Sequence, residues 1–175
     1  NALGDNIICY LDHPDWPLLI GGANGISYYE AQADRFISYN VPIPKDSIVY
    51  ALTTDEQGRL WIGTYREGVY VYNPMDESVK HYNHSDEEEN ISDNLIYSIL
   101  EDSKGRIWVG TNNGLNLLSP GETTFKIYKK EANNQKKLPN NTIREVFEDS
   151  NGDIWIATVG GGIARYQEDA DEFVT

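Results

Sequence analysis

Short apolar runs recur along this chain, and polar turns join them in pairs. The runs VYALTT, IYSILE and IREVFE, which begin at Val49, Ile96 and Ile143, lie before the turns, and LWIGT, IWVGT and IWIAT lie after them. They are rich in β-branched and aromatic residues and too short for helices, so they predict pairs of antiparallel strands. Their apolar residues are nearly continuous rather than alternating, which indicates sheets covered on both faces.

The turns between these runs repeat with a fixed period. In three units an Asp stands three residues before a Gly, which suits a tight turn with Asp at its first position and Gly at its fourth. A Trp follows each Gly, and successive units are 47 residues apart. The repeated residues are Asp55, Gly58 and Trp61, then Asp102, Gly105 and Trp108, and finally Asp149, Gly152 and Trp155. A second glycine turn, a third strand and a short fourth strand complete each unit.

A period in the forties with four strand signals in each unit predicts a β-propeller. We expect an all-β fold in one domain over residues 1–175, with about four four-stranded antiparallel blades that form part of a larger propeller. The first strand of each blade should lie innermost, and the three repeated tryptophans should be buried between adjacent blades. The blades are expected at residues 6–40, 47–83, 94–129 and 141–175.

The first unit departs from this pattern, as terminal repeats often do. Leu19 stands where the later units have Trp, and Trp16 falls in the turn instead, between Pro14 and Pro17. Trp16 either covers the end of its blade or stands exposed, and we expect the former. The last unit stops before the Tyr that should follow Phe173, which favours a partial chain.

Charge and composition limit the partners of this chain. It has 28 acidic against 14 basic residues, a net charge of −14, which disfavours nucleic acid and anionic membrane surfaces. A single cysteine, Cys9, excludes an internal disulfide framework and is expected to be a small buried thiol. No apolar run is long enough to span a membrane, and the first residues do not resemble a signal peptide.

The sequence offers no converging catalytic set. Its three histidines, His13, His81 and His84, do not repeat and lie near no nucleophile motif. His81 and His84 belong to an expected outer strand and its loop, without a cysteine nearby, so we expect no metal site. The glycine runs lie at strand turns with no helix following, and we expect no cofactor. A catalytic pair of carboxylates stays open, since such pairs need not be close in sequence.

The repeat unit resembles the two-component regulator propeller repeat. The shared pattern runs from an Asn through spaced Ile or Val residues to the Asp turn, the Trp strand and the second Gly turn. One copy is carried by Asn94, Ile96, Ile99, Asp102, Gly105, Trp108, Gly110, Thr111, Gly114 and Leu115. Another is carried by Asn141, Ile143, Val146, Asp149, Gly152, Trp155 and Thr158. The copy from Val49 to Val69 also fits, and the first copy fits poorly.

This resemblance implies a function. Such regions are similar to periplasmic sensor domains of hybrid two-component proteins of Bacteroides-type organisms, many of which control polysaccharide use by detecting oligosaccharides. The resemblance implies a non-catalytic sensor, joined to the membrane and to a histidine kinase only through other parts of the parent chain. Two alternatives stay open: a protein-interaction scaffold, and a propeller enzyme resembling the streptogramin lyases.

A ligand is expected where the connectors between blades and the turns after the second strands share one face. Aromatic faces with amides and a guanidinium suit sugar rings, because they offer an apolar platform and directional donors. The alternative is that these residues only pack the rim. The candidate ligand-binding residues are Tyr50, Tyr65, Arg66, Tyr97, Asn112, Asn113 and Arg144, with Glu67 and Val159 on the same turns.

Four blades in an open arc would leave two apolar blade faces uncovered, and patches of that size are seldom left exposed. Three covers are possible. Further blades of the parent protein, a second copy of the chain around a twofold axis, or closure of the four blades into a tight ring would each bury them.

Overall fold

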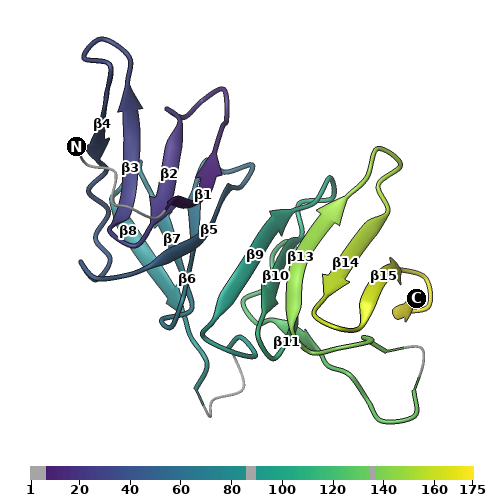
Figure 1. The fold of residues 1–175 in the computed structure, drawn as a ribbon. Helices are drawn as coiled ribbons and strands as arrows, with labels where there is room; N and C mark the ends of the chain where they lie inside the picture. Colours follow the sequence, from purple (N-terminus) through teal and green to yellow (C-terminus); the bar gives the residue numbers. More distant parts are fainter. Residues whose placement is uncertain (1–6, 86–89, 135–136) are drawn as a thin grey trace.

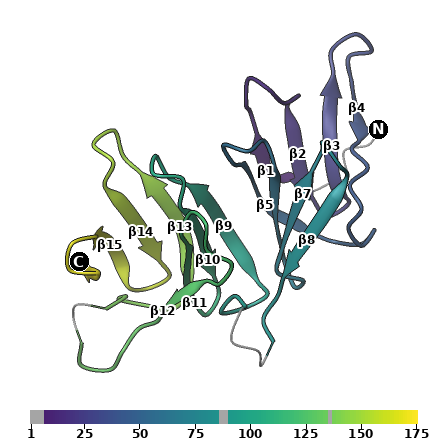
Figure 2. The ribbon, with the colours of Figure 1, turned by 180° about the vertical axis from the view of Figure 1, so that it is seen from behind.

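The computed structural model describes residues 7–85, 90–134 and 137–175, so residue 6, where the first predicted blade begins, lies outside it. Four separate four-stranded antiparallel sheets follow one another along the chain, as predicted (Figures 1 and 2).

Blade 1 consists of β1 (Ile7–Leu11), β2 (Leu19–Gly22), β3 (Gly25–Glu30) and β4 (Arg35–Ser38). Blade 2 consists of β5 (Val49–Thr54), β6 (Leu60–Thr64), β7 (Val69–Asn73) and β8 (Ser78–Tyr82). Blade 3 consists of β9 (Ile96–Glu101), β10 (Ile107–Thr111), β11 (Gly114–Leu118) and β12 (Lys126–Tyr128). Blade 4 consists of β13 (Ile143–Glu148), β14 (Ile154–Thr158), β15 (Gly162–Gln167) and β16 (Glu172–Val174).

The blades are arranged as an open arc. The first strands lie innermost, because β5 contacts both β1 and β9, and β9 contacts β13. Blade 1 and blade 4 lie at opposite ends of the arc, and the termini lie on opposite sides of the molecule in both views (Figures 1 and 2). The four blades therefore do not close into a tight ring, which was one of the three possibilities considered from the sequence.

The Asp-to-Gly turn forms as predicted, and the Asp has a second role that the sequence did not reveal. In blade 3 the Gly105 amide donates to the Asp102 carbonyl at 2.8 Å, and Gly105 adopts the positive φ of 71° that favours glycine. The Asp102 carboxylate also accepts bonds from the Trp108 indole at 2.8 Å and from the Arg106 guanidinium at 2.6 Å. Each Asp therefore ties its turn to the next strand. The equivalent indole bonds run from Trp61 to Asp55 at 2.7 Å and from Trp155 to Asp149 at 2.9 Å.

Two of the three repeated tryptophans are buried between blades, as predicted. Trp61 is 1% exposed and Trp108 is 0% exposed, and Trp108 packs edge-on against Tyr166 of blade 4 at 5.1 Å between ring centroids. The prediction is wrong for Trp155, which is 37% exposed. No blade follows blade 4 in the structure, so the face that carries Trp155 has no partner.

The same absence of a neighbour explains why apolar strand residues of the two end blades are exposed. Phe147 and Ile163 of blade 4 are 58% and 61% exposed, and Tyr10 of blade 1 is 70% exposed. By contrast, every residue of β6 and β10 is buried, because these strands lie between two blades. A continuous apolar run is therefore buried only where its blade has a neighbour on both sides, and in each end blade one apolar face is exposed.

Blade 1 is packed by substitutes for the missing repeat residues. Leu19, at the tryptophan position, is fully buried against blade 2. Trp16 packs edge-on against Tyr39 at 6.2 Å and joins the same core, so it covers the end of the blade as expected. Cys9 is half-buried against this core, and burial raises the pKa of its thiol to about 12.

Adjacent blades approach closest at a glycine in the second strand. A Cβ at Gly110 would lie 2.9 Å from Cγ2 of Ile143, a residue of blade 4 that is fully buried. The same contact occurs between Gly63 and Ile96, where a Cβ would lie 2.6 Å from Cγ2. Only glycine allows the first strand of the next blade to come this near. In blade 4, where no blade follows, Ala157 occupies the equivalent position.

We therefore expect Gly110→Ala to lower the free energy of unfolding by about 1 to 3 kcal/mol, as overpacking of a filled core does. Ile143 has no space into which to move, because blade 4 encloses it. The reverse change at the uncovered position, Ala157→Gly, is the matched control and should cost no more than about 1 kcal/mol. Urea denaturation followed by circular dichroism measures both. Equal losses in the two variants would contradict the assignment of Gly110 to blade contact.

Candidate functional site at the inner mouth of the arc

The connectors and the turns after the second strands lie on one face, as the sequence predicts. The Tyr65 amide donates to the Ile48 carbonyl at 2.9 Å, which ties the β6–β7 turn of blade 2 to the residue preceding β5. Asn112 donates likewise to Leu95 at 3.0 Å. Blade 4 repeats the bond between Val159 and Thr142 at 2.9 Å. We call this the connector face, and the opposite face, which carries the Asp-to-Gly turns, the hairpin face.

A β-bulge lies at the start of every first strand on the connector face. In blade 2 the pairing steps from Val49 with Thr64 to Ala51 with Gly63, so Tyr50 pairs with no residue of β6. A bulge changes the direction of its side chain and often lies beside a functional site. The sequence reasoning missed these bulges, although it identified the equivalent repeat positions. The same step leaves out Ile8, Tyr97 and Arg144 in the other blades.

Five of the seven candidate residues form a continuous row on this face. The rings of Tyr65 and Tyr50 lie 5.3 Å apart, and those of Tyr50 and Tyr97 lie 6.4 Å apart. The guanidinium of Arg66 lies over the Tyr65 ring at one end, 5.0 Å from its centroid, and that of Arg144 lies over the Tyr97 ring at the other end, 4.9 Å from its centroid. We call this row the tyrosine ladder. It crosses blades 2, 3 and 4, so only the tertiary structure assembles it.

The two candidate asparagines take no part in the ladder. The Asn112 carbonyl accepts a bond from the Thr142 hydroxyl at 3.1 Å, and the Asn113 amide donates to the Thr111 hydroxyl at 3.1 Å. Both bonds use the main chain of the asparagines and hold the β10–β11 turn. Over residues 7–85, 90–134 and 137–175, no hydrogen bond joins either amide side chain to the tyrosines of the ladder.

Two further polar residues lie in the innermost strands and were not predicted. The Ser98 hydroxyl donates to the Glu145 carboxylate at 3.0 Å and accepts a bond from the Val146 amide at 3.0 Å, which joins blade 3 to blade 4. Ser98 is buried and Glu145 is exposed. Ser98 and Glu145 are polar residues in first strands that are otherwise largely apolar, and this departure from the pattern is the sequence signal by which the pair could be found.

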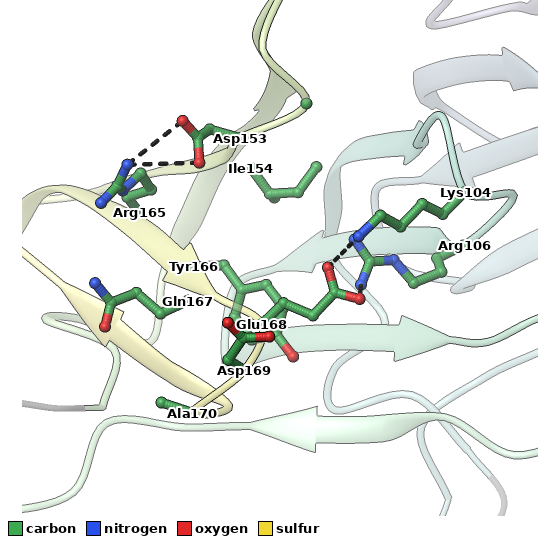
Figure 3. A pocket seen from close by; sticks show the side chains of 11 residues that line it. Lys104, Arg106, Asp153, Ile154, Arg165, Tyr166, Gln167, Glu168, Asp169 and Ala170 are labelled. Carbon is green, nitrogen blue, oxygen red and sulfur yellow. Dashed lines mark hydrogen bonds and ion pairs between the residues drawn. The ribbon is translucent and has the colours of Figure 1, made fainter.

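The hairpin face carries a hollow of about 490 Å³ between blades 3 and 4, lined by the turns of both blades (Figure 3). Its charged groups neutralise one another. Arg106 lies 3.1 Å from Glu168, which also accepts a bond from Lys104, and Arg165 lies 3.4 Å from Asp153 (Figure 3). The pKa of Glu168 is lowered chiefly by the bond from Lys104. The two pairs with Glu168 join blade 3 to blade 4, whereas Arg165 and Asp153 pair within blade 4, and no cation of the hollow is left free for a ligand.

An inter-blade cluster of hydroxyl groups lies next to the hollow. Asp171 accepts bonds from the hydroxyls of Tyr128 at 2.6 Å and Tyr166 at 2.9 Å, and from Lys126 at 2.5 Å. Burial and the bond to Asp171 raise the pKa of the Tyr128 hydroxyl. Burial opposes ionisation of Asp171, but the bonds from Lys126 and the two tyrosines outweigh it and lower its pKa. The cluster fastens blade 4 to blade 3.

The histidines form local contacts. His81 stacks on Tyr70 at 4.1 Å between ring centroids, and its Nε2 lies 2.5 Å from the Glu67 carbonyl. The Nδ1 atom of His84 lies 3.1 Å from the Ile91 carbonyl. Within the described part of the chain, no three acidic, cysteine or histidine residues are grouped as metal ligands would be. The same part contains no helix that is long and apolar enough to cross a membrane.

The four blades, their innermost first strands and the repeated Asp, Gly and Trp define a β-propeller built from sequence repeats. The model of the two component regulator propeller family matches residues 43–66, 90–113 and 137–160, one segment in each of the three later repeats. No curated protein matches the chain.

Solved structures include similar propellers. The extracellular domain assigned to the hybrid two component system BT4673 of B. thetaiotaomicron is 26% identical with a TM-score of 0.78, and the match covers 94% of this chain and 22% of that one. The corresponding domain of BT3049 from the same organism is 26% identical with a TM-score of 0.61, covering 91% and 26%. This chain therefore spans about a quarter of the length of these relatives or less. Virginiamycin B lyase from Staphylococcus aureus is 16% identical with a TM-score of 0.70, covering 98% and 55%, and shares the fold alone.

Proposed function

We propose that this chain is part of a non-catalytic sensory propeller in the periplasm, which belongs to a hybrid two-component system and detects an oligosaccharide to regulate polysaccharide use. The observation that carries the proposal is the tyrosine ladder on the connector face. Three tyrosine rings from two blades follow one another at 5.3 and 6.4 Å. A row of aromatic faces offers an apolar platform to successive sugar rings, and the phenol hydroxyls offer hydrogen bonds.

Two features support this proposal over an enzyme. The two solved structures that are 26% identical are extracellular domains assigned to hybrid two component systems, whereas the lyase shares the fold alone. In the described residues the ladder brings together tyrosines and arginines without a histidine or an activated nucleophile. Such a surface suits recognition, since acid–base or nucleophilic catalysis needs a titrating group within bonding distance of the substrate.

The exposed ends of the arc support a larger assembly. Trp155 and Phe147 occupy the positions that Trp108 and Leu100 hold in blade 3, where blade 4 covers them. We propose that further blades of the parent protein cover these faces in the same way, because the exposed residues repeat those of an interface already present. A second copy of the chain is the alternative cover. Either cover would also extend the connector face beyond blade 4.

Calorimetric titration of the full-length protein that carries this chain against a panel of plant and host oligosaccharides tests the function. We expect one of them to bind, and Tyr50→Ala and Tyr65→Ala to weaken that binding at least about tenfold, because each removes a stacking face. Both tyrosines are only half-buried, so the variants should fold.

Tyr29→Ala is the matched control, because the Tyr29 hydroxyl bonds Asp34 at 2.7 Å on blade 1, away from the ladder. Its affinity should equal that of the unmodified protein. Binding that is unaffected by loss of Tyr50 and Tyr65, in variants with an unchanged melting temperature, would place recognition elsewhere. Failure of every oligosaccharide to bind would reject the sensory proposal.

A further inference from the structure

The six arginines of the chain fall into two groups. Four form ion pairs with carboxylates. The remaining two, Arg66 and Arg144, have no carboxylate within ion-pair distance among the residues that the structure describes, and both are exposed. These two are the arginines at the ends of the tyrosine ladder. The four pairs are Arg35 with Glu30 at 3.8 Å, Arg59 with Asp55 at 2.6 Å, Arg106 with Asp102 at 2.6 Å and Arg165 with Asp153 at 3.4 Å.

This distribution is notable because carboxylates are abundant. The chain has 28 acidic residues against 14 basic ones, so an arginine has many potential partners. The carboxylates nearest in sequence to the ladder are held by other groups. Glu67 accepts the hydroxyl bond of Ser47, and Glu145 accepts that of Ser98. Both free guanidinium groups thus stand beside a glutamate that a serine already binds.

Both free guanidinium groups contact a tyrosine ring of the ladder. Their central carbons lie over the rings of Tyr65 and Tyr97, at 5.0 and 4.9 Å from the ring centroids. The N–H donors of a guanidinium form a fork that matches the two oxygens of a carboxylate. Contact with a ring also restrains a long side chain, so less rotamer freedom is lost when an anion binds.

We infer that the saccharide bound at the ladder carries carboxylates, as uronic acids do, with its rings on the tyrosines and its carboxylates on Arg66 and Arg144. This inference rests on the proposed function and specifies its ligand class. A neutral sugar would use the rings and leave the two guanidinium groups without an anionic partner. The net charge of −14 repels anions at long range, so a local pair of free cations is what an acidic ligand needs in order to bind.

The test compares each acidic saccharide with its own neutral form. Oligogalacturonate, oligoglucuronate and oligomannuronate are titrated into the full-length protein that carries this chain, each beside the carboxyl-reduced oligosaccharide of the same length and linkage. We expect one uronate to bind at least about tenfold more tightly than its reduced form, which is the contribution of one charge-assisted bond. Higher salt should reduce the preference.

Arg66→Gln and Arg144→Gln assign that preference to the ladder. Each variant should weaken uronate binding by about ten- to hundredfold and leave the reduced sugar nearly unaffected. Arg35→Gln, which removes an exposed and paired arginine of blade 1, is the matched control and should change neither affinity. If the arginines only pack the rim, their loss would shift the melting temperature but not the ratio of acidic to neutral affinity.

The remaining outcomes separate the two proposals. A neutral oligosaccharide that binds as tightly as its uronate overturns this inference and leaves the sensory function standing. A sulfated oligosaccharide that binds through the arginines where no uronate does overturns the choice of carboxylate. Failure of acidic, neutral and sulfated saccharides alike overturns both proposals.

Discussion

Replacing Trp108 with alanine should lower the free energy of unfolding by roughly 3 to 5 kcal/mol, the range for large aromatic residues removed from a filled core. Trp108 is fully buried and contacts Tyr128 of its own blade as well as Tyr166 of blade 4. Its loss would leave a cavity between two blades and a buried carboxylate, that of Asp102, without one of its donors. Urea denaturation followed by far-ultraviolet circular dichroism measures the change.

Trp155→Ala is the control that the repeat itself supplies. Trp155 stands at the equivalent position of the repeat and has the same indole bond to an aspartate, but it is 37% exposed because no blade covers it in the structure. We expect a loss of roughly 1 to 2 kcal/mol in the chain of 175 residues, since much of its area is in water in the folded state. Losses of equal size at both positions would show that the local turn, and not contact between blades, determines the role of the tryptophan.

Asp102→Ala should have an effect of similar size, roughly 3 to 5 kcal/mol, because it removes one partner of a buried ion pair. The Asp102 side chain is 0% exposed and that of Arg106 is 11% exposed. Without the carboxylate, the Trp108 indole and two backbone amides of the turn lose their acceptor, and the Arg106 guanidinium keeps only Glu168. The same denaturation experiment tests this expectation.

Asp149→Ala is the matched variant in blade 4. Asp149 is partly exposed, and the position equivalent to Arg106 is occupied in blade 4 by Asp153. Removal of the Asp149 carboxylate therefore leaves no cation at that position without its partner. Loss of the carboxylate removes the bonds from the Trp155 indole and from the backbone amides of Asn151 and Asp153. These donors lie at an exposed turn and can bond to water instead, so we expect a loss of only about 1 kcal/mol. A loss as large as that of Asp102→Ala would contradict the argument from the buried ion pair.

The sequence by itself determined the repeat, the four-stranded blades, the Asp-to-Gly turns and the face on which connectors and second turns meet. These features depend on residues close together in the chain. A tight turn needs Asp and Gly three positions apart, and a strand needs a short β-branched and aromatic run. Because the sequence repeats every 47 residues, the same turns and strands form in each of the later blades. For this reason equivalent positions such as Tyr50, Tyr97 and Arg144 could be aligned without a structure.

What only the tertiary structure decided depends on contacts between blades. Trp155 repeats Trp108 in sequence, but its burial requires a blade that does not follow it in the structure. The bulges that free Tyr50 and Arg144 from strand pairing arise from a shift in register between neighbouring strands, which no local signal marks. Which arginines form ion pairs likewise depends on the carboxylates that the fold brings close to them. The sequence period shows which positions of the repeats are equivalent. What the side chain at each position contacts depends on whether a neighbouring blade packs against it.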